Sequence, residues 1–301
     1  MKNWEYGKVE GGAVGIDEHF ADMMGLVEGG YVYGTLFKHG ETSSKEYELI
    51  LSMYPQENYR TLTNITMYLQ DVPGSSAQAA RFLAGRGINV LNSISLNGIS
   101  DTMIIWKMLA DLSFSGEVDL LKEAFAELKR AGDPSVSKID HIEARQADIG
   151  RVFRSDGGMD KVEIKKAPPI TLENGRYDLI AEYGEWLAPY DGGNVLITAD
   201  YASWMVSISF LSEGTSLMKI GLSMPDCPGS ITQVLDWIAS KNINLISVFT
   251  KVKICYQAMT MDLVANFKDS TVAPEDFPAE MEKAFGCMNG VFELTEFGKL
   301  G

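Results

Sequence analysis

The segment Asp71-Val72-Pro73-Gly74-Ser75 occurs twice in this chain, because it returns 155 residues later as Asp226-Cys227-Pro228-Gly229-Ser230. The similarity continues beyond it in the same register, without a gap. It includes four identical pairs, which are Gln78 and Gln233, Ala84 and Ala239, Ile88 and Ile243, and Asn89 and Asn244. An internal repeat of this length predicts one architectural unit that is used twice.

The hydrophobic periodicity around each copy predicts the same order of elements. The first copy is expected to form a strand from residue 62, a helix over 75–86, strands over 88–96 and 102–109, a helix over 118–130 and a strand over 136–142. In the second copy the corresponding ranges are 217–224, 230–241, 243–253, 257–265, 275–285 and 290–297. This βαββαβ order gives a four-stranded antiparallel sheet with two helices on one face, the ferredoxin-like arrangement. The predicted fold class is therefore α+β.

Five segments are expected along the chain. The two ferredoxin-like modules cover 62–142 and 217–301, and a small β-rich segment precedes each of them, over 1–61 and 166–216. Each small segment is predicted to contain one helix, over 16–24 or 177–186, followed by two strands. The range 143–165 is polar, contains Asp156-Gly157-Gly158 and predicts a linker.

The two repeated helices differ in the bulk of their expected core faces. The first presents Ser76, Ala79, Ala80 and Leu83, whereas the second presents the larger side chains of Ile231, Val234, Leu235 and Ile238. Because bulkier buried side chains fill a core more completely, the second module is predicted to be the more stable one.

Composition excludes several classes of function. Of the 301 residues, 46% are hydrophobic and 22% charged, which is typical of a soluble globular protein. The formal net charge of −15 disfavours binding to nucleic acid and to anionic membranes. No signal peptide or membrane-spanning apolar run is visible, and the odd set Cys227, Cys255 and Cys287 contains no C-x-x-C pair. A cytoplasmic protein with reduced cysteines is expected.

Both modules resemble ACT domains, which are small regulatory modules that bind amino acids. In that family the first strand often ends in an Asp/Asn-x-Pro-Gly turn, and a Gly-Ile/Val-Asn phrase opens the second strand after the helix. The matching positions are Asp71 to Gly74 with Gly87-Ile88-Asn89, and Asp226 to Gly229 with Asn242-Ile243-Asn244. The resemblance covers about 62–142 and 217–297. It implies regulatory binding of an amino acid, or a related small acid, at an interface between two such modules.

The resemblance also indicates residues that would contact a ligand. In family members that bind serine, an asparagine in the turn and the asparagine that opens the second strand touch the ligand. By position these are Asp71 or Asp226, and Asn89 or Asn244. The turn residue is aspartate here, and no histidine precedes either turn, so the chain departs from the serine-binding pattern.

The chemistry of the repeated residues agrees with an amino-acid ligand. The helix N-termini at the two Gly-Ser steps offer unpaired N–H groups to a carboxylate, and the aspartates can pair with an ammonium group. The candidate ligand-binding residues are Asp71, Val72, Pro73, Gly74, Ser75 and Asn89, with Asp226, Cys227, Pro228, Gly229, Ser230 and Asn244. The same turn can also be a purely structural connection in which Asp or Ser caps the helix, and this alternative stays open.

No common catalytic motif is present, because the chain lacks H-E-x-x-H, G-x-x-x-x-G-K-[ST] and G-x-S-x-G. No catalytic residue, metal ligand or cofactor is predicted. The predicted function is non-catalytic sensing of a small molecule, and exposed sheet edges make a homodimer the expected assembly. Two alternatives are a transcriptional regulator whose small β-rich segments touch DNA, and a regulatory subunit of a separate metabolic enzyme.

Overall fold

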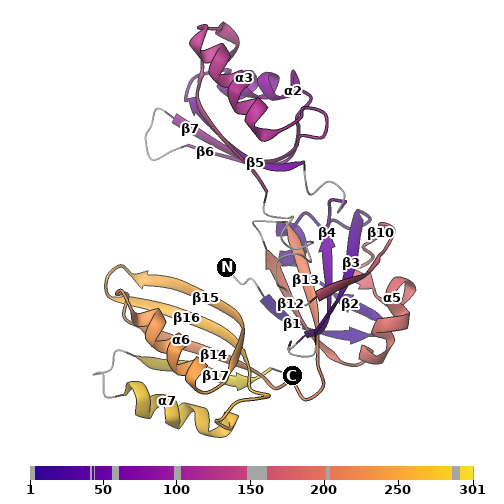
Figure 1. The fold of residues 1–301 in the computed structure, drawn as a ribbon, viewed down its shortest axis with the longest axis vertical. Helices are drawn as coiled ribbons and strands as arrows, with labels where there is room; N and C mark the ends of the chain where they lie inside the picture. Colours follow the sequence, from indigo (N-terminus) through magenta and orange to yellow (C-terminus); the bar gives the residue numbers. More distant parts are fainter. Residues whose placement is uncertain are drawn as a thin grey trace. The chain divides into compact units, whose positions relative to one another are not determined.

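The computed structural model describes residues 4–40, 43, 45–55, 61–97, 103–147, 161–200, 204–286 and 292–300. The chain has a mixed α+β fold with mostly antiparallel sheets. It divides into two compact units. The larger unit consists of Met1–Leu51, Asp160–Asp200 and Met205–Gly301, and the smaller one of Ser52–Met159 with Tyr201–Trp204. Figure 1 shows the elements of each unit in sequence colours.

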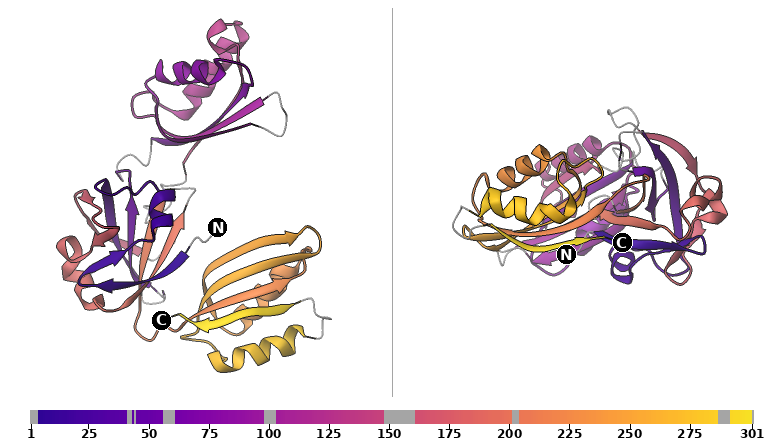
Figure 2. Two further views of the ribbon diagram at one scale, coloured as in Figure 1. Left: turned by 180° about the vertical axis from the view of Figure 1, so that it is seen from behind. Right: turned by 90° about the horizontal axis from the view of Figure 1, so that it is seen from below.

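The smaller unit contains the first repeat, which we call module 1. Its elements are β5 (Leu62–Gln70), α2 (Ser75–Ala84), β6 (Asn89–Asn97), β7 (Met103–Asp111), α3 (Val118–Arg130), the short 3-10 helix η2 (Pro134–Val136) and β8 (Ile139–Gln146). The four strands pair in the order β6-β7-β5-β8. Helices α2 and α3 cover one face of this sheet (Figures 1 and 2).

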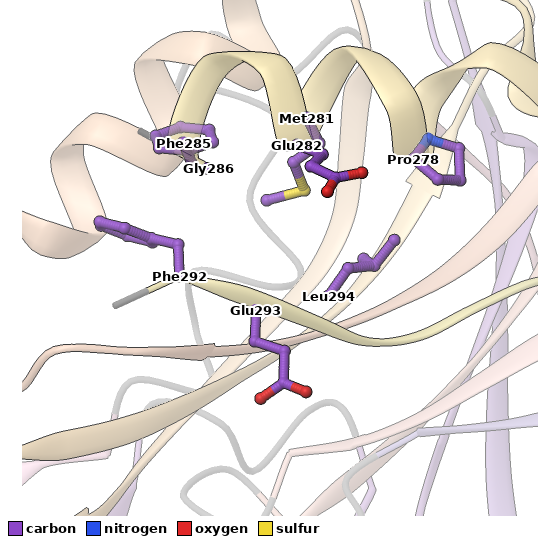
Figure 3. A pocket seen from close by; sticks show the side chains of 8 residues that line it. All are labelled: Pro278, Met281, Glu282, Phe285, Gly286, Phe292, Glu293 and Leu294. Atoms are coloured by element: carbon purple, nitrogen blue, oxygen red, sulfur yellow. The ribbon is translucent and has the colours of Figure 1, made fainter. Parts of the chain in front are cut away.

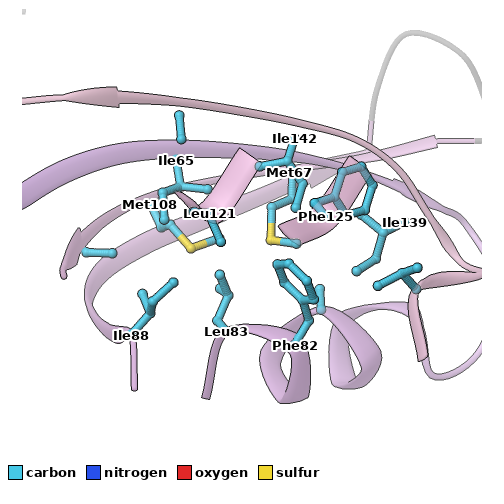
Figure 4. Close-up of a cluster of buried hydrophobic side chains, with 14 of the residues drawn as sticks. Ile65, Met67, Phe82, Leu83, Ile88, Met108, Leu121, Phe125, Ile139 and Ile142 are labelled. Carbon is cyan, nitrogen blue, oxygen red and sulfur yellow. The ribbon is translucent and has the colours of Figure 1, made fainter. Parts of the chain in front are cut away.

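The core of module 1 lies between its sheet and its two helices. Strand β5 alternates because its side chains point to opposite faces, so Ile65 and Met67 are buried. Phe82 of α2 and Phe125 of α3 point toward them (Figure 4) and meet edge to face, with ring centroids 5.8 Å apart. Phe82 therefore supplies bulk to a helix that was predicted to bury only small residues and Leu83.

The second repeat, module 2, belongs to the larger unit. Its elements are β14 (Leu217–Met224), α6 (Ser230–Ser240), β15 (Asn244–Ile254), β16 (Ala258–Asn266), the 3-10 helix η4 (Pro274–Asp276), α7 (Phe277–Phe285) and β17 (Glu293–Lys299). The strand order β15-β16-β14-β17 is equivalent to that of module 1. Trp237 of α6 packs against Phe277 and Phe285 of α7, with ring centroids 5.3 and 5.6 Å from its own.

The remaining strands form one central sheet of nine strands. They are β1 (Trp4–Glu10), β2 (Ala13–Gly15), β3 (Tyr31–His39), β4 (Lys45–Ser52), β9 (Lys161–Lys166), β10 (Ile170–Thr171), β11 (Arg176–Asp178), β12 (Asn194–Asp200) and β13 (Met205–Leu211). Their order is β10-β3-β4-β13-β12-β1-β2-β11, and β9 also pairs with β3. The helices α1 (Glu18–Met23) and α5 (Ile180–Leu187), with the 3-10 helix η3 (Ala188–Tyr190), connect these strands. The two small β-rich segments thus build a single shared sheet.

The order of the central sheet shows that its two halves are related. Strands β4 and β13 are neighbours at the middle, and each follows an equivalent strand, β3 or β12, in the chain. Strand β3 then pairs with β9, and β12 pairs with β1, so each half adds an equivalent strand at its outer side. Gly29-Gly30 and Gly192-Gly193 lie directly before the equivalent strands β3 and β12.

Two predicted elements differ from the structure. The helix expected over 177–186 begins only at Ile180, because Arg176–Asp178 is a strand in which Tyr177 is buried. Both ends of the range 143–165, expected to be a linker, are strands, since β8 continues to Gln146 and β9 begins at Lys161. The Asp156-Gly157-Gly158 part of that linker lies outside the described residues. The five segment boundaries stay predictions.

Module 2 packs against the central sheet within the larger unit. Leu217 and Val264, on the sheet face away from α6 and α7, form a buried cluster with Trp4 of β1 and Leu196 of β12. This contact covers apolar side chains on the sheet face that α6 and α7 leave open. None of the helices in the described part of the chain is long and apolar enough to cross a membrane.

Candidate functional site

The turn of module 1 presents the start of helix α2 to solvent. Gly74 is the N-cap of α2 and has a left-handed conformation with φ 86°, which glycine adopts without a Cβ penalty. No side chain caps this helix. Ser75, which is buried, instead donates from both its N–H and its hydroxyl to the carbonyl of Val72, at 3.2 and 2.9 Å. Asp71 to Gly74 are exposed.

The turn of module 2 has the same backbone. Gly229 is the N-cap of α6 and has φ 94°. No side chain caps this helix either. The N–H of the buried Ser230 donates to the carbonyl of Cys227 at 3.2 Å. The alternative in which Asp or Ser caps these helices is therefore wrong, because a glycine occupies the N-cap position in both copies.

The first-turn amides are the donors that the turns leave available. Among the described hydrogen bonds, no protein acceptor receives the N–H groups of Ser76 and Ala77 in module 1, or of Ile231 and Thr232 in module 2. The first amides of a helix have no partner inside the helix and lie at the positive end of its dipole. Both turns can therefore donate to an anion.

The two turns differ in what surrounds the aspartate. In module 2 the Asp226 carboxylate accepts a hydrogen bond from the N–H of Tyr256 at 2.7 Å, which ties the turn to the β15–β16 hairpin. In module 1 no protein partner of the Asp71 carboxylate is found among the described residues. Lys138 Nζ instead donates to the carbonyl of Pro73 at 2.7 Å, which brings a positive charge beside the turn.

The candidate asparagines lie at the opposite end of each sheet from the turns. Asn89 pairs with Asp111, which pairs with Leu62 at the start of β5, whereas the turn follows Gln70 at its end. Asn244 pairs with Asn266, which likewise pairs with the first residue of β14. Eight strand positions correspond to roughly 26 Å. Within one module, the structure therefore does not bring the asparagine and the turn together.

Replacing either cap glycine with alanine is expected to destabilise its module by about 1–2 kcal/mol, because an L side chain in the left-handed region is strained. No atom lies within 4 Å of a Cβ placed on Gly229, so the effect there isolates backbone strain. Gly298→Ala is a matched control in the same module, since Gly298 is equally open and its φ is not positive. Chemical denaturation of the three variants measures the effect. Equal stability of Gly229→Ala and Gly298→Ala would contradict the prediction.

Two pockets lie away from the predicted site residues. One, of about 390 Å³, lies between α7 and β17, where Met281 and Leu294 face one another across it (Figure 3). The other, of about 640 Å³, lies beside α1, and Glu28 at its edge accepts hydrogen bonds from the N–H groups of Asn174 and Gly175. Neither pocket includes a residue of the turns or a candidate asparagine.

A buried charged cluster on the central sheet, the Glu48 cluster, was not predicted from the sequence. Glu48 Oε1 accepts hydrogen bonds from Lys45 Nζ at 2.6 Å and Ser207 Oγ at 2.7 Å. Its Oε2 lies 3.2 Å from His39 Nε2 and 3.8 Å from the buried Lys161 Nζ. These residues come from β3, β4, β9 and β13, so their proximity depends on pairing between distant strands, which local patterns do not reveal.

The Glu48 cluster holds its carboxylate in the charged form. Burial alone would raise the pKa of Glu48, but hydrogen bonds from His39, Lys45 and Ser207 and the charge of Lys45 bring that pKa well below its usual range. Burial lowers the pKa of Lys161, and the nearby Glu48 charge opposes this shift. The cluster is thus a compensated set of buried charges, with no group of three or more His, Cys, Asp or Glu residues suited to a metal among the described residues.

Comparisons with known proteins give low similarity. No protein-family model matches the chain. No curated protein sequence matches it either. Among solved structures, it is similar to an unknown protein from Galdieria sulphuraria, with 10% identity and a TM-score of 0.28 over 80% of this chain and 99% of that one. It is also similar to the acetolactate synthase small subunit from Thermotoga maritima, with 7% identity and a TM-score of 0.22 over 80% of this chain and 93% of that one. Similarity at this level assigns no function.

Proposed function

We propose that the chain is a non-catalytic sensing or regulatory protein built on two ferredoxin-like, ACT-like modules, and that it binds an amino acid or a related small acid. The observation that carries this proposal is the pair of exposed turns whose N-cap is a left-handed glycine. In each turn a carboxylate could receive hydrogen bonds from first-turn amides, without competition from a capping side chain. A purely structural connection would more usually have Ser, Thr, Asp or Asn at that position.

The ammonium group of the ligand would pair with the turn aspartate. Asp71 is exposed and has no protein partner among the described residues, so its carboxylate is available to a cation. Asp226 already accepts from the Tyr256 amide, which leaves fewer of its lone pairs for a ligand. Lys138 adds positive charge beside the Gly74 amides, at the end of the site that would hold the carboxylate. These differences favour module 1 as the stronger binder.

The separation of turn and asparagine within a module supports a site between two modules. A free amino acid is much shorter than the roughly 26 Å between them, so one ligand could contact both groups only if a second module contributes the asparagine. A homodimer would supply such a module, with Asn89 or Asn244 offering both a donor and an acceptor. We therefore propose an interfacial site and a homodimeric assembly, with a separate metabolic enzyme as a possible regulated partner.

A thermal-shift screen of the full chain with the twenty amino acids tests this function. A ligand at 100 times its dissociation constant should add about 2.7 kcal/mol to the free energy of unfolding. At least one amino acid is expected to raise the midpoint, and Asp71→Ala should reduce that shift strongly. Asp119→Ala is the control, because Asp119 is an exposed aspartate in α3 of the same module. If no amino acid shifts the midpoint, the amino-acid ligand is excluded.

A further inference from the structure

A second internal repeat relates the two short helices of the central sheet. Residues 9–32 align without a gap with residues 172–195, 163 positions later, so α1 corresponds to α5 and β2 to β11. Identical residues include the pairs Glu10 and Glu173, Gly12 and Gly175, Gly29 and Gly192, Gly30 and Gly193, and Val32 and Val195. Strands β2 and β11 pair through the equivalent residues Val14 and Tyr177, so the two copies face one another. The surroundings of α1 and α5 are therefore equivalent places in one repeated unit.

The space beside the start of α1 is open, whereas the equivalent space beside α5 is filled. A Cβ placed on Gly12 would overlap the side chain of Ile180. At the equivalent Gly175, the nearest atom beyond the adjoining residues is the carbonyl oxygen of Ile16, 3.8 Å away. Asp17 stands at the position of Ile180 in the first copy, and the pocket of about 640 Å³ beside α1 includes Gly175 in its lining. The open space thus comes from the side chains of the first copy and not from the shared backbone.

The floor of this pocket is apolar. Its lining includes the buried side chains of Ile16, Ala21, Leu26 and Leu172. A cavity of this size with an apolar lining and a small number of polar groups is typical of small-molecule sites. An aliphatic chain that lies on this floor would lose contact with water, which favours binding.

Two carboxylates of α1 lie beside the apolar floor. Glu18 and Asp22 are four positions apart in the helix, so they share one of its faces, and both line the pocket. Both residues are exposed, and neither carboxylate has a partner among the described hydrogen bonds and ion pairs. Like charges at this spacing repel one another, so a bound cation would relieve the repulsion. Ala181 stands at the position of Glu18 in the second copy, so this pair of carboxylates belongs to the open copy alone.

The pocket lining carries a net negative charge. Besides the two carboxylates of α1 it contains Glu28, whose oxygens accept backbone N–H groups from the turn before β11. The basic side chain in this lining is Arg176, and its Nη2 donates to the carbonyl oxygen of Glu10 at 2.7 Å. Three carboxylates and one guanidinium group give the lining a formal charge of −2.

From the apolar floor, the adjacent carboxylates and this charge, we propose that the pocket beside α1 binds an aliphatic diamine in its doubly protonated form. The two ammonium groups pair with the carboxylates of Glu18 and Asp22, and the methylene chain lies on the apolar floor. A monoamine would satisfy only one of these carboxylates, and an uncharged diol neither of them. The site is independent of the proposed amino-acid function, because no residue of the two turns and no candidate asparagine lines the pocket.

Calorimetric titration of the full chain with cadaverine, a linear aliphatic diamine, tests this proposal. We expect one equivalent of cadaverine to bind, and no binding of the diol of the same chain length. Glu18→Gln and Asp22→Asn should each weaken binding about tenfold or more, because each removes one charge-assisted hydrogen bond. Glu185→Gln is the matched control, since Glu185 is exposed and is the equivalent of Asp22 in the second copy. This control should bind cadaverine as the wild type does.

Nonspecific attraction of a cation to a chain with a net charge of −15 is the competing explanation. Several equivalents of cadaverine bound alike by the wild type and all three variants would show such attraction and overturn the proposal. No binding, equal binding of the diol, or an equal loss with Glu185→Gln would also overturn it. All three substitutions are at exposed side chains, and a circular dichroism spectrum that matches the wild type shows that each variant has folded.

Amide exchange locates the bound diamine. Cadaverine is expected to slow exchange in α1 and at Asn174 and Gly175, whose N–H groups donate to Glu28 at the edge of the pocket. Unchanged exchange at all of these residues, in a titration that shows binding, would contradict the proposed site.

Discussion

Replacing Glu48 with glutamine is expected to lower the free energy of unfolding of the larger unit by about 3–5 kcal/mol, because removal of one member of a buried charged pair is strongly destabilising. The variant takes a negative charge away from the Lys161 ammonium group, whose side chain is only 4% exposed and lies 3.8 Å from the Glu48 carboxylate. Glutamine keeps the size of the side chain and can still accept from Ser207, so the variant removes charge more than volume. Amide exchange of β3 and β4 reports the opening of this unit separately.

The pH dependence of the free energy of unfolding gives a second test of the Glu48 cluster. The pKa of Glu48 is lower in the folded chain than its unfolded value of about 4.3. Its contribution is therefore fully present above the unfolded pKa and is lost as the pH falls through the folded pKa. The wild type should lose stability below pH ~4 more steeply than Glu48→Gln.

Glu10→Gln is the matched control for Glu48→Gln. The pair between Lys8 and Glu10 is 3.9 Å long and more than half exposed, so its loss should change stability by less than about 0.5 kcal/mol. An equal and small effect of the two glutamine variants would show that the Glu48 cluster does not stabilise the central sheet.

Replacing Gly34 with alanine is expected to destabilise the same unit by about 3 kcal/mol, at the upper end of typical overpacking costs. A Cβ at residue 34 would overlap the hydroxyl oxygens of both Tyr177 and Tyr183, and it would lie 3.4 Å from Leu49 Cδ1. Both tyrosines are fully buried, so their rings cannot move without disturbing close-packed neighbours. Chemical denaturation, followed by amide exchange of β3, measures the loss.

A compensating change tests this interpretation of Gly34. Both tyrosine hydroxyls are buried, and burial raises the pKa of Tyr183 to about 12. Changing Tyr177 and Tyr183 to phenylalanine removes the overlapping atoms, so alanine at position 34 should then cost much less. Gly15→Ala, at a glycine with no neighbour within 4 Å of an added Cβ, should be close to neutral. A cost that persists in the phenylalanine background would contradict the steric explanation.

The sequence predicted the elements of both modules well, because their signals are local. Helix α3 occupies the predicted range Val118–Arg130, since Leu121 and Phe125 form one buried stripe between a turn and a Gly-Asp-Pro stop. Strand β14 likewise follows its alternating pattern over Leu217–Met224. The predicted core face of α2 is wrong in part, because Ser76 and Ala80 are exposed and Phe82 is buried in the core instead. The prediction that module 2 is the more stable one rested on small core residues in α2, and Phe82 weakens that argument. It stays a prediction.

The central sheet could not be predicted from local patterns. Trp4 pairs with Thr198, and Tyr31 pairs with Thr171, so the partners are more than a hundred residues apart. The sequence around Tyr177 has a helical pattern. Tyr177 nevertheless lies in strand β11, and its side chain is fully buried. Partner choice between distant strands depends on tertiary packing, which propensity does not encode.

At the candidate site, too, the features set by neighbouring residues were predicted better than the others. Pro-Gly steps predicted two tight turns before helices, and both turns are present. The alternative in which Asp or Ser caps each helix is wrong, because the N-cap residue is a glycine, which adopts the left-handed conformation without a Cβ penalty. The separation of Asn89 from Asp71 follows from the predicted strand–helix–strand order, because α2 runs back along the sheet and β6 begins at the end where β5 begins.

The proposed binding of an amino acid at the Gly74 and Gly229 turns is tested most directly by amide exchange of the full chain. The exchange is measured with and without a saturating concentration of the amino acid that the thermal-shift screen identifies. The proposal predicts the largest protection at Ser75 to Ala77, at Ser230 to Thr232, or at both, with protection also at Asn89 or Asn244. Protection confined to the pocket beside α1 or to the pocket between α7 and β17, with both turns unchanged, would contradict it.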